Sequence, residues 1–165
     1  MTHSFRLLTM DSDRIREAIR APLAAFKAGH VADDGKSYVL IPLQDAAGEV
    51  VGGLSAYTSD QWLHVDLLFV PSELSGQGWG RRIMDCAERE AVRRGCHACW
   101  LGTFEFQARG FYERLGYECF AELPDHPRGH SMYFMRKALR PTTPEVGGVS
   151  SGSKAECGAG AVDEE

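Results

Sequence analysis

The chain has 165 residues, a formal net charge of −5 at neutral pH and 44% hydrophobic residues, which is the composition of an ordinary globular protein. No run of residues approaches the ~20 consecutive apolar positions that a membrane-spanning helix needs. Residues 1–13, MTHSFRLLTMDSD, also lack the pattern of a secretory signal. We therefore expect a cytoplasmic protein without a membrane partner.

The negative charge is concentrated at the C-terminal end of the chain. Residues 141–165 are acidic and rich in Gly and Ser, and they contain no Leu, Ile or aromatic residue, which predicts a disordered tail. Residues 1–140 are then close to neutral, so no basic face is expected to hold a nucleic acid. We divide the chain into a folded domain over residues 1–140 and a tail over residues 141–165.

The pattern of apolar residues predicts alternating strands and helices along the domain. The N-terminal part is expected to form a short strand over residues 4–9 and then a helix for which Asp11, Ser12 and Asp13 are candidate N-caps. Pro22 is expected to end that helix or to start a second one that runs to about Gly29. Six further strands are expected over residues 37–43, 49–59, 62–70, 96–104, 117–123 and 131–139. Two further helices are expected over residues 80–95 and 107–116.

Cys96 and Cys99 have the C-x-x-C spacing of a zinc or redox site. A structural zinc site needs a second pair of ligands at a matching distance, and the sequence offers none. Both cysteines also fall in an expected strand, where residues three apart point to opposite faces. We favour reduced thiols in the core and expect no metal site.

A glycine-rich stretch, SGQGWG at residues 75–80, lies between an expected strand and an amphipathic helix. Three glycines so close together are explained either by a tight turn or by a backbone that a phosphate group approaches closely. The start of a helix offers unpaired N–H groups and a positive partial charge, and Arg81 and Arg82 follow directly. The Walker A and Rossmann patterns both differ from this stretch. A pyrophosphate fits the stretch best.

At these residues the sequence resembles the GCN5-related N-acetyltransferases (GNAT). SGQGWG matches their acetyl-CoA motif, Q/R-x-x-G-x-G/A, with Ser75 at the first position. A second family motif, A-x-x-F-Y-x-x-x-G-F/Y, is present without a gap over residues 108–117. The resemblance covers residues 4–139 and implies an α/β (α+β) fold. Its central sheet would be mixed, mostly antiparallel and six- to seven-stranded, with about four helices and a splay between strands four (62–70) and five (96–104).

The resemblance further implies an acetyl-CoA-dependent N-acetyltransferase that moves the acetyl group directly to a primary amine of a small molecule. Acetyl-CoA would be a co-substrate, and no metal is implied. The expected coenzyme-binding residues follow the fourth strand and the glycine loop: Leu68, Phe69, Val70, Gly76, Gln77, Gly78, Trp79, Gly80 and Arg81.

Four residues are candidates for the catalytic steps. By the resemblance, Tyr112 is the general acid near the coenzyme sulfur, although a core tyrosine would fit the same position. His64 and Asp66 are two residues apart on one strand, which places them on one face, and either could be the general base or part of a solvated face. Glu105 could bind the amine, act as the base, or be an acid that favours the N-terminus of the next helix.

The acceptor is not determined by these motifs. The alternatives are a protein or peptide acetyltransferase, acting on N-termini or lysines, and a catalytically silent acyl-CoA-binding module. Family members often dimerise, so a homodimer is a further expectation that the sequence does not specify.

Overall fold

The computed structural model describes residues 4–31 and residues 35–139, and these two stretches belong to separate compact units. The tail expected over residues 141–165 lies outside the described residues. None of the helices in the described part of the chain has the length and apolarity that crossing a bilayer requires.

The first unit contains one continuous helix, α1 (Asp13–Ala28). The Ser12 hydroxyl accepts a hydrogen bond from the Ile15 amide and caps its N-terminus. Two sequence-based expectations were wrong here. Residues 4–9 form no strand, since no strand of the described sheet pairs with them. Pro22 lies inside the helix without ending it, because its loss of one backbone hydrogen bond is offset by neighbouring residues that favour a helix.

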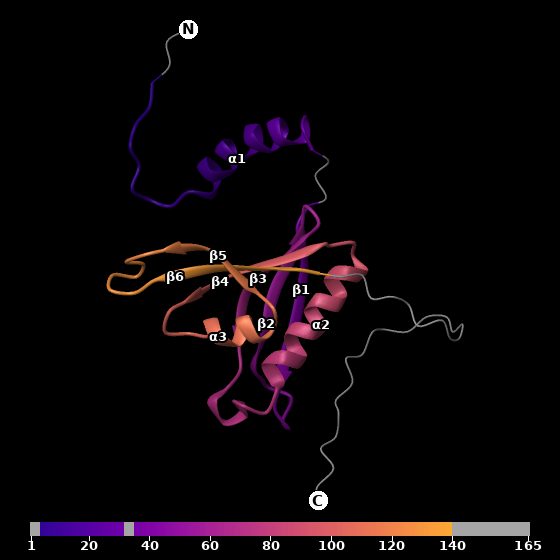
Figure 1. Cartoon of the computed structure of the whole chain (residues 1–165). Helices are drawn as coiled ribbons and strands as arrows, with labels where there is room; N and C mark the ends of the chain where they lie inside the picture. Colours follow the sequence, from indigo (N-terminus) through magenta and orange to yellow (C-terminus); the bar gives the residue numbers. More distant parts are fainter. Residues whose placement is uncertain (1–3, 32–34, 140–165) are drawn as a thin grey trace, which may run out of the picture. The chain divides into compact units, whose positions relative to one another are not determined.

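The second unit is built on a six-stranded sheet with the order β1-β2-β3-β4-β6-β5 (Figure 1). The β3–β4 pair is parallel and every other pair is antiparallel, which confirms the expected mixed, mostly antiparallel sheet. The described residues contain three α-helices rather than about four, because α1 replaces the two helices expected near the N-terminus. The strands are β1 (Ser37–Gln44), β2 (Val50–Ser59), β3 (Trp62–Phe69), β4 (Ala98–Phe104), β5 (Glu118–Leu123) and β6 (Met132–Ala138), with helices α2 (Trp79–Arg93) and α3 (Arg109–Arg114).

Strands β3 and β4 separate along their length, as expected for strands four and five of the sequence-based scheme. They pair only from Trp62 opposite Ala98 to Val65 opposite Leu101. Beyond that point β3 continues beside β2, and β4 continues beside β6. The sheet therefore opens between two strands that are both still extended.

A β-bulge lies at the point where the two strands separate. Ala56 of β2 pairs with Val65, whereas the preceding Ser55 pairs with Leu67, so Asp66 has no partner across the β2–β3 ladder. An extra residue reverses the alternation of side chains beyond it. Leu63 and Val65 are buried before the bulge, and Leu68 packs against the core after it.

Helix α2 packs against the face of the sheet formed by β1, β2 and β3 (Figure 1). Its buried residues recur every three or four positions, as in an amphipathic helix; they are Ile83, Met84, Ala87, Glu88 and Ala91. Cys96 and Cys99 are buried in the same core, which confirms that they are core residues. Burial raises the pKa of the Cys99 thiol to about 12, so it stays protonated.

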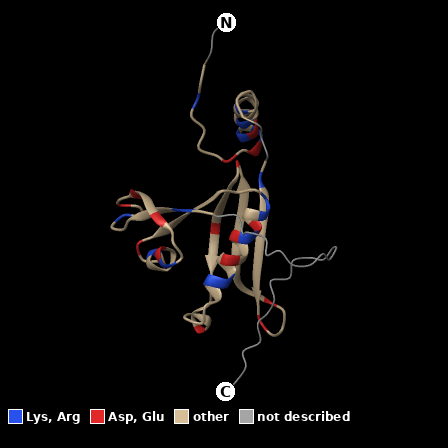
Figure 2. Ribbon diagram, turned by 45° about the vertical axis from the view of Figure 1, so that its right-hand side comes forward, with Lys and Arg blue, Asp and Glu red and all other residues tan. Residues whose placement is uncertain are grey.

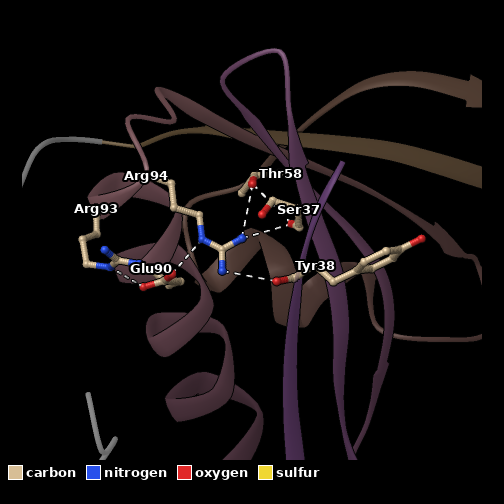
Figure 3. Close-up of polar contacts among 6 residues, drawn as sticks. All are labelled: Ser37, Tyr38, Thr58, Glu90, Arg93 and Arg94. Atoms are coloured by element: carbon tan, nitrogen blue, oxygen red, sulfur yellow. Dashed lines mark hydrogen bonds and ion pairs between the residues drawn. The ribbon is translucent and has the colours of Figure 1, made fainter. Parts of the chain in front are cut away.

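The C-terminal end of α2 is tied to the sheet through Arg94 (Figure 3). Its guanidinium group donates to the carbonyl oxygens of Ser37 and Tyr38, at 3.0 and 3.2 Å. Arg94 and Arg93 both donate to the Glu90 carboxylate at 2.7 Å. These bonds lower the pKa of Glu90 to about 2. Glu90 therefore holds Arg94 in the orientation that joins the helix to β1.

Replacing Glu90 with Gln should lower the free energy of unfolding by about 1–2 kcal/mol at pH 7, because two partly exposed ion pairs are lost. The folded-state pKa lies below the ordinary value of 4.5, so this contribution is present above pH 4.5 and disappears as the pH falls towards 2. Urea unfolding at several pH values should show the difference from wild type shrinking in that range. A Glu49→Gln control should differ little from wild type throughout, and a pH-independent difference for Glu90→Gln would contradict the assignment.

Candidate active site

The separation of β3 and β4 coincides with a cavity of about 750 Å³ in the second unit. Its wall consists of β3 from Val65 onwards, the turn that follows it, the start of α2, the middle of β4 and the residues around α3. A volume of this size falls within the range of small-molecule and cofactor sites. The cavity thus lies where two strands leave a gap in the sheet, beside the start of a helix.

The glycine loop forms one wall of the cavity, and its glycines are needed for two different reasons. Gly76 and Gly78 have φ angles of +81° and +82°, a conformation that side chains with a Cβ rarely adopt. Gly80 permits close packing, because a Cβ there would lie 3.1 Å from Cζ of Phe111 in α3. No side chain among the described residues caps the N-terminus of α2, so the N–H groups of its first turn are left for solvent or a ligand.

The cavity has opposite charges on different walls. Among the described residues that line it, Asp66 is the acid, and Arg81 and Arg114 are the basic residues. Figure 2 shows that α2 as a whole carries both signs, so no single-sign field from this helix dominates. The basic groups belong to the start of α2 and to α3, whereas Asp66 lies in the bulge of β3. An elongated ligand with an anionic end would fit this arrangement.

Tyr112 lines the cavity from α3 and is 7% exposed. Its ring packs edge-on against Phe111 and Tyr117. Burial raises the pKa of its hydroxyl to about 12, so the group is protonated at neutral pH. The Tyr112 hydroxyl makes no hydrogen bond to another described residue. A proton donor is therefore present at the cavity wall.

A buried polar cluster fixes the segment that carries Tyr112. The Tyr117 amide donates to the Tyr112 carbonyl at 3.0 Å, and the Tyr117 hydroxyl donates to Glu88 of α2 at 2.9 Å. Lys137 of β6 donates to the other oxygen of the same carboxylate at 2.6 Å. Because Glu88 lies in the helix that begins at the glycine loop, this cluster links the loop, the tyrosine and the sheet.

His64 lies next to the separation of the strands but does not line the cavity. Its ring stacks on Trp100 at 3.9 Å between centroids, and Tyr57 contacts it edge-on. Its Nδ1 atom is buried without a hydrogen-bond partner among the described residues. Burial lowers the pKa of the imidazole, and the nearby Asp66 carboxylate only partly opposes this effect. Asp66 lies at the cavity wall, whereas His64 lies outside the lining.

Glu105 also lies away from the cavity lining. Its carboxylate accepts a hydrogen bond from the Ser131 amide at 3.1 Å and lies 3.8 Å from His130. Gln77 is also absent from the lining, and its side chain donates to the Glu73 carbonyl at 2.9 Å. The other expected residues line the cavity: Asp66, Leu68, Phe69, Val70, Gly76, Gly78, Trp79, Gly80, Arg81 and Tyr112.

Some lining residues were not singled out from the sequence. Arg114 and Phe111 come from α3, and Thr103 and Gln107 flank the end of β4. Phe111 belongs to the second motif, so the motif could have indicated it. Arg114 occupies a variable position of that motif and carries no sequence signal. Among the described residues, no group of three or more His, Cys, Asp or Glu side chains is arranged to hold a metal ion.

The family profile described as the acetyltransferase (GNAT) family matches residues 5–117. A blasticidin-S acetyltransferase from Streptomyces morookaense is 43% identical over 93 residues, which are 56% of this chain and 68% of that protein. An acetyltransferase from Agrobacterium fabrum is 32% identical over 134 residues, or 81% of this chain and 98% of that protein.

The fold agrees with these sequence matches. A crystal structure of a protein from Agrobacterium tumefaciens, described as a candidate acetyltransferase, superposes with a TM-score of 0.76 at 32% identity. The superposition covers 82% of this chain and 99% of that one. The chain therefore belongs to the acetyltransferase (GNAT) family.

Proposed function

We propose that the protein transfers the acetyl group of acetyl-CoA directly to a primary amine of a small molecule. The observation that carries this proposal is the cavity where β3 and β4 separate, with the glycine loop on one wall and a protonated tyrosine on another. Membership of an acetyltransferase family supports the type of reaction.

The glycine loop would hold the diphosphate of the coenzyme. The N–H groups at the start of α2 and the guanidinium group of Arg81 suit an anion at a helix N-terminus. From Leu67 to Phe69, β3 pairs with β2 on one edge, while β4 has left the other edge. Backbone groups on that free edge suit the amides of the pantetheine arm, which would place the thioester near Tyr112.

The reaction requires the amine nitrogen to attack the thioester carbonyl carbon and the carbon–sulfur bond to break. Tyr112 would donate its proton to the departing thiolate, since its raised pKa keeps it protonated until the thiolate forms. The carboxylate among the described lining residues is that of Asp66. We propose that it holds the ammonium group of the acceptor and acts as the general base, taking up the proton directly or through water. The positions of His64 and Glu105 outside the lining make them weaker candidates for the base.

A small molecule is the proposed acceptor because the relative at 43% identity is named for a small molecule, blasticidin S. The acid at the cavity wall is Asp66, which favours a cationic amine over a neutral or anionic one.

A Gly78→Ala variant should bind acetyl-CoA at least about tenfold more weakly. The new Cβ would stand at the cavity wall and strain a residue whose φ is +82°. Gly95 provides a matched control, since its φ is +85° and it lies at the opposite end of α2, away from the cavity. Both variants should lose a similar ~1 kcal/mol of stability, and calorimetric titration should show weakened binding for Gly78→Ala alone. Equal affinities would contradict the assignment of the loop.

Replacing Tyr112 with Phe should lower kcat by about 100-fold or more, because the departing thiolate loses its proton donor. The KM for acetyl-CoA should change little, since the ring and its packing remain. Tyr38→Phe is the matched control, because Tyr38 is exposed on β1 outside the cavity and should give wild-type kinetics. An unchanged kcat for Tyr112→Phe would remove the tyrosine from the mechanism.

The release of CoA from acetyl-CoA should be measured with a panel of polyamines, aminoglycosides, nucleoside antibiotics, amino acids and short peptides. We expect turnover with small cationic amines and little with peptides. Preferential turnover of peptides would overturn the acceptor class. Stabilisation of the fold by acetyl-CoA without any turnover would favour a silent binder, and neither stabilisation nor turnover would contradict the assignment of the cavity.

A further inference from the structure

Arg114 differs from the other arginine of α3 in having no acidic partner. Arg109 forms an ion pair with Glu113 at 2.8 Å, within the same helix. Arg114 lines the cavity, its side chain is exposed, and it forms no ion pair or hydrogen bond with a described residue. Its Nη1 atom lies 3.5 Å from the position that a Cβ of Gly110 would occupy, so the guanidinium group lies back along α3.

A second unpaired guanidinium group faces the same cavity. Arg81, in the first turn of α2, has no ion-pair partner among the described residues. The two helices approach each other here, because the Phe111 ring packs against Gly80. Two cationic side chains from different helices therefore line one cavity, whereas its acidic lining residue, Asp66, lies in the β3 bulge. Such an uncompensated pair favours a ligand with more than one anionic group.

Coenzyme A carries two separate anionic groups, a diphosphate and a phosphomonoester on the 3′ oxygen of its ribose. The glycine loop, the start of α2 and Arg81 account for the diphosphate. Resting on the proposed function, we propose that Arg114 binds the 3′-phosphate and so makes the protein prefer coenzyme A to dephospho-coenzyme A. A guanidinium group suits this role because its planar fork can donate two hydrogen bonds to one phosphate.

The test uses the full-length protein and two ligands that differ only in the 3′-phosphate, CoA and dephospho-CoA. Dissociation constants are measured by calorimetry, so that the result does not depend on turnover. Wild type should bind CoA about tenfold more tightly than dephospho-CoA, which is the effect of one charge-assisted contact. Arg114→Gln should lose that preference: its affinity for CoA falls about tenfold, while its affinity for dephospho-CoA is unchanged.

Two controls keep the result specific. Arg136→Gln removes the same charge from a residue that pairs with Glu118 and does not line the cavity, so it should retain the wild-type preference. Arg114→Lys keeps the charge but loses the fork, and it should retain part of the preference. Thermal unfolding of each variant checks that the fold is intact, which is expected because the Arg114 side chain is exposed.

Two outcomes would overturn the role of Arg114 and leave the proposed function standing. An equal loss of affinity for both ligands would place Arg114 on the diphosphate, and no loss for either would place it in solvent. If wild type bound neither CoA nor dephospho-CoA, the proposed function would fail as well. The affinity of the wild-type protein therefore separates the two hypotheses.

Discussion

Strands β3 and β4 stop pairing after Val65 and Leu101 although both remain extended, and the site depends on this break in the sheet. Each strand keeps its outer neighbour, so the break does not leave either strand without a partner. The inner edge of β3 is left with backbone groups that no strand of the described sheet satisfies. Unpaired backbone groups beside a cavity are costly unless water or a ligand pairs with them. The same break thus coincides with the cavity and leaves backbone groups on its wall that suit the amides of the proposed ligand.

The sequence predicted the strand β3 correctly, but the bulge at Asp66 changes the orientation of the side chains that follow it. Uninterrupted alternation would place Leu67 and Phe69 on the buried face with Val65. The extra residue shifts the pattern beyond Asp66, so that Leu68 packs against the core while Leu67 and Phe69 are exposed. A bulge of this kind is determined by pairing with β2, which is distant in sequence, and no local residue type marks it.

The glycine loop was predictable because its geometry is local. Positive φ angles at Gly76 and Gly78, and the helix that follows, are properties of one short segment. The N-terminal segment was harder, since a strand over residues 4–9 depends on a partner strand rather than on its own composition. Arg114 could not be identified either, because its proposed role depends on the approach of α3 to α2 through Phe111 and Gly80.

The buried Glu88 carboxylate also affects how Tyr112, the proposed proton donor, is placed relative to the glycine loop, the proposed diphosphate site. Glu88 is 9% exposed and receives hydrogen bonds from Tyr117 and from Lys137. A buried carboxylate is tolerated only when such partners compensate for its lost hydration, and the partners must come from fixed positions. The Tyr117 amide also donates to the carbonyl of Tyr112. The bonds to Glu88 therefore constrain α2 and Tyr112 together. The distance between the glycine loop and the tyrosine is thereby set by a polar contact in the core, outside the cavity itself.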